Sequence, residues 1–326
     1  MSEGAVSAER ADSPLRAIAY LVIGLTLFSL QDVIIKSLSG AYAVHQIVFI
    51  RGLVALFPIL AIVYWEGGLE RLKTATPGLN ILRGLIGFTC YTTYYMALTV
   101  LPLADAVTLF YASPLFVTAL SVPFLKEAVG LRRWLAVGVG FLGVVVVMQP
   151  GAGSFDPAMA FGVVAALTYA FQILLTRTLG KSQAGSTMSF HSMLVFIAAS
   201  GLVGLVVGGG AYESQGHPSV QFLLRAWVWP SWVDLGLISV CGLIAGVGFY
   251  LLSQAYRLAA PSTVAPFEYS SLPWAILWGF LIWEDLPEQA TLLGILLVAG
   301  SGLYIIHRET LRGRKVVRGR PLRPRI

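Results

Sequence analysis

The sequence predicts an all-α integral membrane protein in which ten transmembrane helices form two inverted five-helix repeats. Three observations support this fold class: an apolar composition, ten apolar segments of span length and an internal duplication. Of the 326 residues, 57% are hydrophobic and 12% are charged, whereas soluble domains average roughly 45–50% apolar and 25% charged residues. The mean hydropathy is +0.78. This composition excludes a soluble enzyme of ordinary make-up.

Ten apolar segments are long enough to cross a bilayer as helices. A hydrocarbon core about 30 Å thick needs about 20 apolar residues per helix. Lipid offers no partners to backbone polar groups, and the segments are too long and too uniformly apolar for barrel strands. The expected spans are Leu15–Leu38, Ala43–Trp65, Pro77–Val100, Leu103–Phe124, Leu131–Met148, Pro157–Leu179, Thr187–Gly209, Trp232–Leu258, Thr263–Trp283 and Glu288–His307.

The second half of the chain repeats the first. The matched pairs are Gln31 and Gln172, and Lys36 and Arg177, at an offset of 141, and Gly84 and Gly242, and Tyr111 and Tyr269, at an offset of 158. A period near 150 residues excludes short solenoid repeats and indicates a fused duplication. Because each half has an odd number of spans, the halves enter the membrane from opposite sides. Such an inverted repeat suits alternating access to a shared site.

The duplication divides the chain into five parts. They are a cytoplasmic N-terminal tail (1–14), a first repeat (15–148), a linker (149–156), a second repeat (157–307) and a basic cytoplasmic tail (308–326). No cleavable signal peptide is expected, since the first apolar segment has full span length. The side shared by both termini receives 19 of the 22 Lys and Arg residues, so the positive-inside rule places both termini in the cytoplasm. The basic tail is expected to rest on anionic lipid, and nucleic acid is not expected as a partner.

The first two spans carry charged residues. Asp32 and Lys36 lie with Thr26 and Ser29 on one face of span one. An ionised carboxylate at bilayer depth costs at least about 2.5 kcal/mol and needs a partner, water or a proton. Asp32 is therefore either a coupling residue or the partner of Lys36, one turn away. In span two, Arg51 is expected to reach the outer interface with its long side chain and to act as an anchor; a role in substrate binding is the alternative.

Span three is unusually aromatic, with Tyr91, Tyr94 and Tyr95 close together. Tyrosine is common in interfacial belts. These side chains lie inside the span, however, where aromatic faces in a cavity would suit a flat or cationic ligand. Span six carries a polar stripe through Gln172 that echoes span one. Spans five and ten lack internal carboxylates and are expected to be scaffold.

Spans four and nine contain prolines in their interior. Span four carries Asp105 and Tyr111 before Pro114, and span nine carries Glu268 and Tyr269 between its own prolines. Proline frees a backbone carbonyl and is tolerated in a membrane helix when neighbouring groups satisfy that carbonyl. Interrupted helices at corresponding positions of two repeats are a pointer to a transport site; simple kinks are the alternative.

The longest connection, between spans seven and eight, is rich in aromatic residues. Phe222, Trp227, Trp229 and Trp232 surround Arg225. This pattern indicates a segment that lies in the outer interface and anchors the protein. The same connection contains the extra residues that raise the offset between the repeats from 141 before it to 158 after it.

Several stretches together carry a family resemblance. They are LFSLQDVIIKSL followed by HQIVFIRG, ALTVLPLADAV through SPLFVTALSVPFLKE, and AYRLAAPSTVAPFEYSSLPWAILWGFLIWE. In this order the chain resembles the drug/metabolite transporter superfamily, specifically proteins with two EamA-type repeats, over roughly Leu15 to His307. The resemblance implies a ten-helix carrier of the bacterial inner membrane whose cavity is lined by spans one to four and six to nine. Family members move amino acids, nucleotide-like metabolites such as S-adenosylmethionine, riboflavin, or small metallophores.

The sequence therefore predicts a secondary transporter of a small organic metabolite, planar or aromatic, with uptake favoured. Efflux of amino acids, metallophores or toxic compounds is the alternative. No metal or cofactor is expected, and a homodimer is left open. The candidate substrate-binding residues are Gln31, Tyr91, Tyr94, Tyr95, Tyr111, Gln172, Tyr269 and Trp274, and the candidate proton-coupling or charged residues are Asp32, Asp105 and Glu268.

Two other classes of function rank below transport. A membrane-embedded enzyme would need a catalytic motif, but the sequence contains no HExxH, no GxSxG and no Cys or His cluster at metal-ligand spacing. A non-transporting scaffold or receptor would not need polar residues inside its spans.

Overall fold

The computed structural model describes residues 14–125, 130–149, 156–180, 182–213, 216–258 and 264–318. Most of the N-terminal tail and of the linker, the turn containing Lys126 and Glu127, and the end of the basic tail lie outside these ranges. Within the ranges the chain forms helices and turns and no strand. Helical segments cover each of the ten ranges that the sequence indicates as spans.

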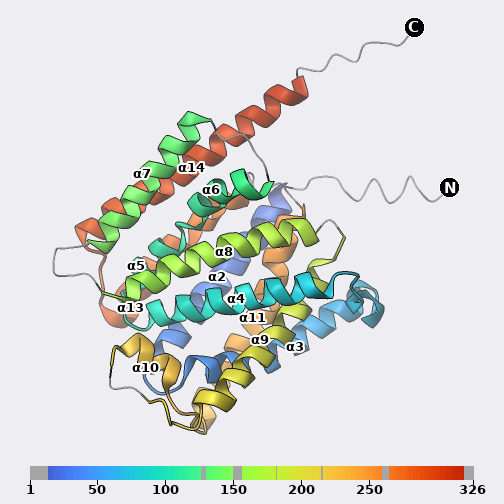
Figure 1. Ribbon diagram of the computed structural model, residues 1–326, viewed down its shortest axis with the longest axis vertical. Coiled ribbons are helices and arrows are strands. Elements are labelled where there is room, and N and C mark those ends of the chain that lie inside the picture. The colour runs from blue at the N-terminus through green and yellow to red at the C-terminus, as the bar shows by residue number, and fades with distance from the viewer. Residues whose placement is uncertain are drawn as a thin grey trace.

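The helices of each half follow one another with short connections (Figure 1). Those of the first half are α2 (Pro14–Leu38), α3 (Val44–Gly67), η1 (Leu69–Leu72), α4 (Pro77–Leu98), α5 (Leu103–Phe110), α6 (Ser113–Leu125) and α7 (Leu131–Met148). Those of the second half are α8 (Ala158–Leu179), α9 (Gly185–Val207), α10 (Pro218–Leu224), α11 (Trp232–Leu258), η2 (Ala265–Ser270), α13 (Ser271–Trp283) and α14 (Gln289–Arg318). Because α14 continues past His307, the first part of the expected basic tail is helical.

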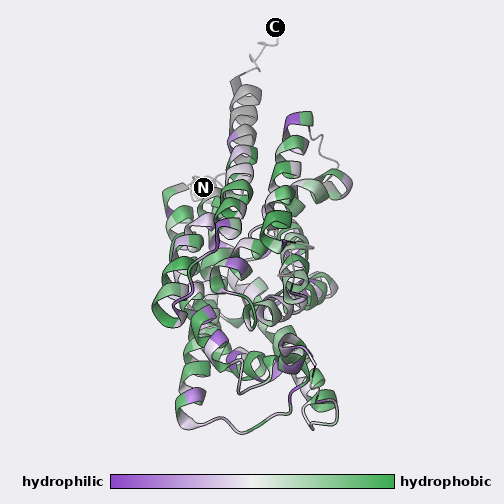
Figure 2. Ribbon diagram, turned by 90° about the vertical axis from the view of Figure 1, so that its left-hand side faces the viewer, coloured by the Kyte–Doolittle hydropathy of each residue, from purple (hydrophilic) through white to green (hydrophobic). Residues whose placement is uncertain are grey.

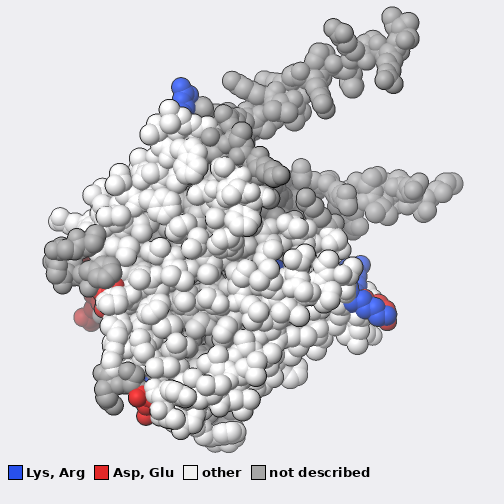
Figure 3. Space-filling model, viewed as in Figure 1, with Lys and Arg blue, Asp and Glu red and all other residues white. Residues whose placement is uncertain are grey.

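The outer surface of the bundle is that of a membrane protein. Large apolar side chains project from it, for example Leu205 with 84% and Phe57 with 73% of its surface exposed, and hydrophobic residues cover most helices in Figure 2. Charged side chains are sparse on the face in Figure 3 and lie near its edges. In water, a protein with such an apolar surface would be prone to aggregation, whereas in a membrane this surface contacts lipid.

Six helical stretches are long and apolar enough to cross a membrane, by length and composition. They are Leu15–Leu38, Val44–Gly67, Leu103–Phe124, Ala158–Thr176, Gly185–Val207 and Trp232–Tyr256. The chain is therefore an all-helical membrane protein in the part that the structure describes. The count of ten crossings stays a prediction.

Span four is broken between two α-helices, and span nine changes from a 3-10 helix to an α-helix without a gap. α5 ends at Phe110, and α6 begins at Ser113 directly before Pro114, which has no N–H to continue the hydrogen-bond ladder. In span nine, the 3-10 helix η2 contains Pro266 in its first turn and passes into α13 at Ser271.

The helices pack in a pattern that is symmetric between the two halves. α2 packs against α11 as α8 packs against α4, and α3 packs against α11 as α9 packs against α4. α3 also pairs with α9, and α7 with α14, so these helices contact their own equivalents. The pair of α7 and α14 lies at one edge of the bundle in Figure 1. Exchanging the two halves leaves this set of contacts unchanged, as an inverted repeat requires.

Two glycines allow close approach at equivalent helix crossings. Gly84 of α4 faces Val195 of α9, and Gly242 of α11 faces Val54 of α3. A Cβ added to either glycine would lie 2.6 Å from the valine Cβ. The two glycines are 158 positions apart and the two valines 141 positions apart, so the contacts are reciprocal under the duplication. Small residues at helix crossings are the usual means of close packing in membranes.

The connection between α9 and α11 packs over the ends of α2 and α3 and does not only anchor the surface. Phe222 of α10 is fully buried, and the indole Nε1 of Trp227 donates to Nδ1 of His45 at 2.5 Å. Trp229 and Trp232 project outward, with 87% and 83% of their surface exposed. Of the aromatic residues expected as anchors, these two are placed for that role, whereas Phe222 and Trp227 hold the connection against the bundle.

Candidate functional site

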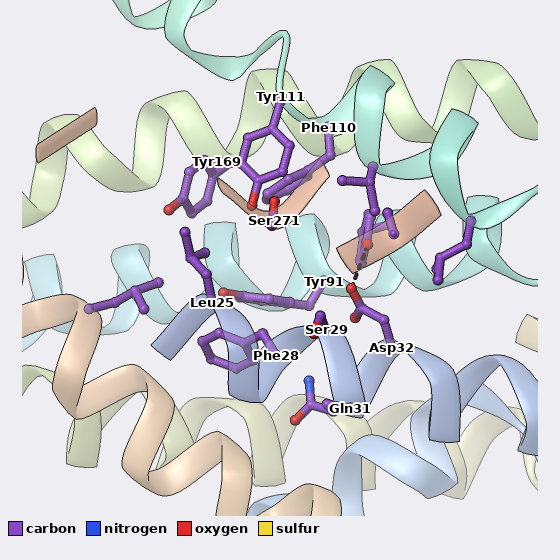
Figure 4. Close-up of a pocket in the computed structure, with 15 residues that line it drawn as sticks. Leu25, Phe28, Ser29, Gln31, Asp32, Tyr91, Phe110, Tyr111, Tyr169 and Ser271 are labelled. Carbon is purple, nitrogen blue, oxygen red and sulfur yellow. Dashed lines mark hydrogen bonds between the residues drawn. The ribbon is translucent and has the colours of Figure 1, made fainter. Parts of the chain in front are cut away.

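A pocket lies in the centre of the bundle between the two halves (Figure 4). It is lined mainly by aromatic and aliphatic side chains from α2, α4, α5, α8, α11 and α13. The lining residues are Leu25, Phe28, Ser29, Gln31, Asp32, Tyr91, Tyr94, Leu103, Val107, Phe110, Tyr111, Tyr169, Leu252, Ser271 and Ala275. The two broken helices contribute Tyr111, at the C-cap of α5, and Ser271, at the start of α13. The interruptions therefore face the pocket.

Aromatic rings form one wall of the pocket. The ring of Phe110 lies 4.9 Å from that of Tyr94 and 4.9 Å from that of Tyr169, measured between centroids. Tyr111 packs edge-on against Phe110 at 5.6 Å. Such tilted and edge-on contacts hold the rings in place, and aromatic faces attract cations and stack on flat ligands.

The pocket lies where residues of one repeat contact their own equivalents in the other. Tyr91 and Phe249 are 158 positions apart, as are Tyr111 and Tyr269. The rings of the first pair contact at 5.2 Å and those of the second at 5.9 Å. A residue meets its own equivalent only near the axis that relates the repeats. The pocket is therefore on that axis, at the kind of interface where inverted-repeat transporters bind substrate.

One carboxylate faces the pocket. Asp32 is the one charged residue among those of the lining. Its Oδ2 accepts a hydrogen bond from the Tyr94 hydroxyl at 2.8 Å, drawn in Figure 4. A carboxylate in such apolar surroundings interacts strongly with a cation and is costly to leave unpaired. A positively charged ligand in the pocket would have Asp32 as its partner.

Lys36 is engaged at one end of the pocket and does not contact Asp32. Its Nζ donates to the carbonyl oxygens of Leu98 at 2.9 Å and Leu101 at 2.5 Å. The same ammonium lies 5.4 Å from the centroid of the Trp283 ring. The alternative in which Lys36 neutralises Asp32 by direct contact is not what the structure adopts. Lys36 instead joins α2 to the ends of α4 and α13.

Glu268 lies behind the aromatic wall. Its surface is 2% exposed. Its Oε1 accepts hydrogen bonds from the hydroxyl of Tyr169 at 3.4 Å and from the hydroxyl of Tyr256. Because Tyr169 lines the pocket, one side chain connects Glu268 to it. The equivalent of Glu268 in the first half is Phe110, so the charges around the pocket are not symmetric although the helices are.

Arg51 is fully buried, so the expectation that it reaches the outer interface is wrong. Its Nη1 donates to the Tyr95 hydroxyl at 2.6 Å. In the amide orientation that satisfies all neighbours, Gln31 Oε1 accepts from Tyr95 at 2.8 Å and from Arg51 Nη1 at 3.1 Å, and Nε2 donates to the Cys241 carbonyl at 3.0 Å. The packing of α3 against its neighbours turns Arg51 inward, and residue spacing along one helix does not reveal that rotation.

Comparison with known proteins places the chain in a family. Residues 15–149 match the EamA-like transporter family. The S-adenosylmethionine uptake transporter of Rickettsia conorii is 28% identical over 90% of this chain and 94% of its own length. The chain is an EamA-type transporter of the drug/metabolite transporter superfamily.

This EamA-type transporter has relatives with other names. The riboflavin transporter of Vibrio cholerae is 27% identical over 80% of this chain and 82% of its own. The pseudopaline exporter CntI of Pseudomonas aeruginosa is 24% identical over 85% and 91%. A solved crystal structure aligns over 91% of this transporter and 98% of that chain with a TM-score of 0.60 at 18% identity. That alignment shows a shared fold.

The transporter gathers some of the candidate residues and separates others. The lining contains Gln31, Asp32, Tyr91, Tyr94 and Tyr111, and the layer behind it contains Tyr95, Glu268 and Tyr269. Gln172 lies at the crossing of α8 with α4. Trp274 stacks on Trp278 at 6.0 Å. Asp105 accepts a hydrogen bond from Thr291 of α14 at 2.7 Å, so it faces α14.

Three aromatic residues of the lining are not singled out by the sequence patterns. They are Phe28, Phe110 and Tyr169. A signal exists for two of them, because Phe28 and Tyr169 are 141 positions apart and thus repeat equivalents. Phe110 has no such signal, because its equivalent is Glu268. A lone aromatic residue in an apolar span is indistinguishable from a lipid-facing one until the helix is packed.

Proposed function

We propose that this transporter carries a small organic cation with a planar ring, of the S-adenosylmethionine type, across the bacterial inner membrane, with uptake as its direction. The pocket on the repeat axis carries the proposal, because Asp32 is its one charged lining residue and tyrosines surround it. S-adenosylmethionine combines a flat adenine ring with a sulfonium cation. The ring suits stacking on tyrosine, and the cation suits a carboxylate flanked by aromatic faces.

Riboflavin is the second candidate, because a flavin ring would stack on the same tyrosines. It carries no cation, however, and leaves Asp32 with the Tyr94 hydroxyl alone. The Rickettsia relative is named for uptake and the Pseudomonas relative for export. The first has the higher identity and the longer coverage of this chain, which favours uptake.

Transport would proceed by alternating access, with ten crossings in two inverted repeats and both termini in the cytoplasm. The exchange symmetry of the helix contacts supports the repeats. The start of α2 and the end of α14 lie at the same end of the bundle in Figure 1, which supports an even number of crossings. Two similar halves can rock about a shared midplane site. At the end where Lys36 holds α4 and α13 against α2, its contacts must break for substrate to pass.

Counterflow in liposomes tests the substrate class. Purified protein in liposomes preloaded with unlabelled S-adenosylmethionine is expected to accumulate labelled S-adenosylmethionine, because exchange through one site needs no energy source. Preloading with riboflavin is expected to drive no such accumulation. Protein-free liposomes provide the background. Counterflow of riboflavin without counterflow of S-adenosylmethionine would reject the cationic substrate.

Glu268→Gln is expected to abolish gradient-driven accumulation while sparing exchange. Glu268 is a buried carboxylate that is hydrogen-bonded to the hydroxyl of Tyr169 in the pocket wall. A carboxylate can take up and release a proton during the transport cycle, whereas an amide of the same shape cannot. Uptake under an imposed proton gradient and counterflow without a gradient would be measured on the same liposomes. Glu213→Gln, in the exposed connection before α10, is the matched control. Full accumulation by Glu268→Gln would remove the coupling role.

A further inference from the structure

Arg51 is a buried cation with unused hydrogen-bond donors. Its side chain is fully buried in α3. Nη1 bonds to the Tyr95 hydroxyl, but Nε and Nη2 have no hydrogen-bond partner in the described part of the chain. A buried donor without a partner is destabilising by about 1–3 kcal/mol, and more for a charged group. The site therefore lacks an acceptor, and an anion would suit it best.

Arg83 shows that this fold can satisfy a buried arginine. It lies in α4 with 4% of its surface exposed. Its Nε donates to Thr176 Oγ1 at 2.7 Å, and its Nη1 donates to the Met188 carbonyl at 3.1 Å and to Ser192 Oγ at 2.6 Å. Ser192, which binds Arg83, is the repeat equivalent of Arg51, because it lies 141 positions later. The two arginines therefore lie at equivalent helix crossings, but on opposite helices of the crossing pair. Of these two buried arginines, Arg51 is the one that lacks acceptors.

Asp32, the carboxylate next to Gln31 in the chain, already has another hydrogen-bond partner. Asp32 follows Gln31 in α2, but it bonds to Tyr94 on the pocket side. The ion pairs found among the described residues do not include Arg51. The guanidinium lies over the Tyr95 ring, 5.4 Å from its centroid, but this contact uses none of its N–H donors. A bound ligand could supply the missing acceptor.

Gln31 forms the wall between Arg51 and the pocket. It is a lining residue, and its Oε1 lies 3.1 Å from Arg51 Nη1. This neutral amide oxygen occupies the place of an acceptor that a carboxylate would fill more strongly. Arginine binds a carboxylate through two parallel N–H donors, and Nε and Nη2 of Arg51 are two donors without a partner in the described part of the chain.

We propose that Arg51 receives the carboxylate of the substrate when Gln31 turns aside, while Asp32 holds the cationic centre. The transporter then recognises both charges of its ligand, the cationic centre and the amino-acid carboxylate. This inference rests on the proposed function and narrows it. It assigns the site to cationic nucleosides that keep their α-carboxylate, and it excludes flavins as preferred substrates.

A comparison of two ligands tests the inference on the unmodified protein. S-adenosylmethionine and its decarboxylated form would each compete against labelled S-adenosylmethionine in the counterflow assay. The decarboxylated form has the greater positive charge, so attraction to Asp32 alone would make it the better competitor. A carboxylate bound by Arg51 instead makes it at least about tenfold weaker, since a hydrogen bond to a charged group is lost.

Two variants locate the effect. Arg51→Gln is expected to bring the two competitors to equal strength or to reverse their order, and Arg51→Lys to keep part of the preference, because lysine keeps the charge without the fork of donors. The ratio of two affinities on one protein does not report changes in the amount of folded protein. Equal competition in the wild type would overturn the inference alone. If S-adenosylmethionine shows no counterflow, the proposed function falls with it. If Arg51→Gln does not fold, the wild-type comparison still decides.

Discussion

Asp32→Asn is expected to weaken the apparent affinity for S-adenosylmethionine by about 10- to 150-fold, because an interaction with a charged group is worth about 1.5–3 kcal/mol. Asparagine keeps the size of the side chain and can still accept a hydrogen bond from Tyr94, so the change removes charge and little else. The measurement is the concentration dependence of counterflow into liposomes.

The controls for this variant separate charge from shape. Asp32→Glu restores the charge one methylene further out and is expected to recover part of the affinity. Asp234→Asn changes a carboxylate that bonds to Tyr42 and Ser231 at the beginning of α11, outside the pocket lining, and is expected to leave the affinity unchanged. An Asp32→Asn protein with wild-type affinity would mean that the pocket does not bind its substrate through a cation.

Gly242→Ala is expected to destabilise the transporter by about 1–3 kcal/mol, the usual cost of overpacking. The new Cβ would lie 2.6 Å from the Cβ of Val54 and 2.8 Å from the carbonyl oxygen of Arg51. Neither atom is the end of a flexible side chain, so α11 and α3 must separate. Thermal unfolding in detergent would register the loss as a lower midpoint.

The same helix offers a matched control. Gly236, earlier in α11, has open space where a Cβ would be added. Gly236→Ala is expected to be neutral or to stabilise by up to about 1 kcal/mol, because alanine is the better helix former. The reciprocal variant Gly84→Ala, against Val195, should behave as Gly242→Ala does. Equal midpoints for Gly242→Ala and Gly236→Ala would contradict the close crossing.

The candidate site shows how far residue patterns reach. Asp32 and Tyr94 are found from the sequence because a carboxylate and an aromatic cluster stand out in apolar spans. Their mutual hydrogen bond is not found, since the two residues are 62 positions apart and belong to different helices. Asp105 looks equivalent to Asp32 by composition, yet it faces Thr291 of α14. A charged residue within a span is expected to face inward, but the sequence does not show which helices it faces.

Local rules determined the helices, their breaks and the duplication of this protein. Lipid permits few backbone structures, proline removes one donor from a hydrogen-bond ladder, and a duplicated gene leaves fixed offsets between its halves. These features depend on residues close in sequence or on the sequence compared with itself.

The tertiary structure alone decided which faces meet. Spans that are apolar on most sides give little information about rotation around their own axes, and that rotation depends on close contacts such as those of Gly84 with Val195 and Gly242 with Val54. Those contacts turned Arg51 inward, away from water. They also brought Tyr111 against Tyr269 on the repeat axis. The pocket exists because helices far apart in sequence pack at these angles, and no single helix encodes it.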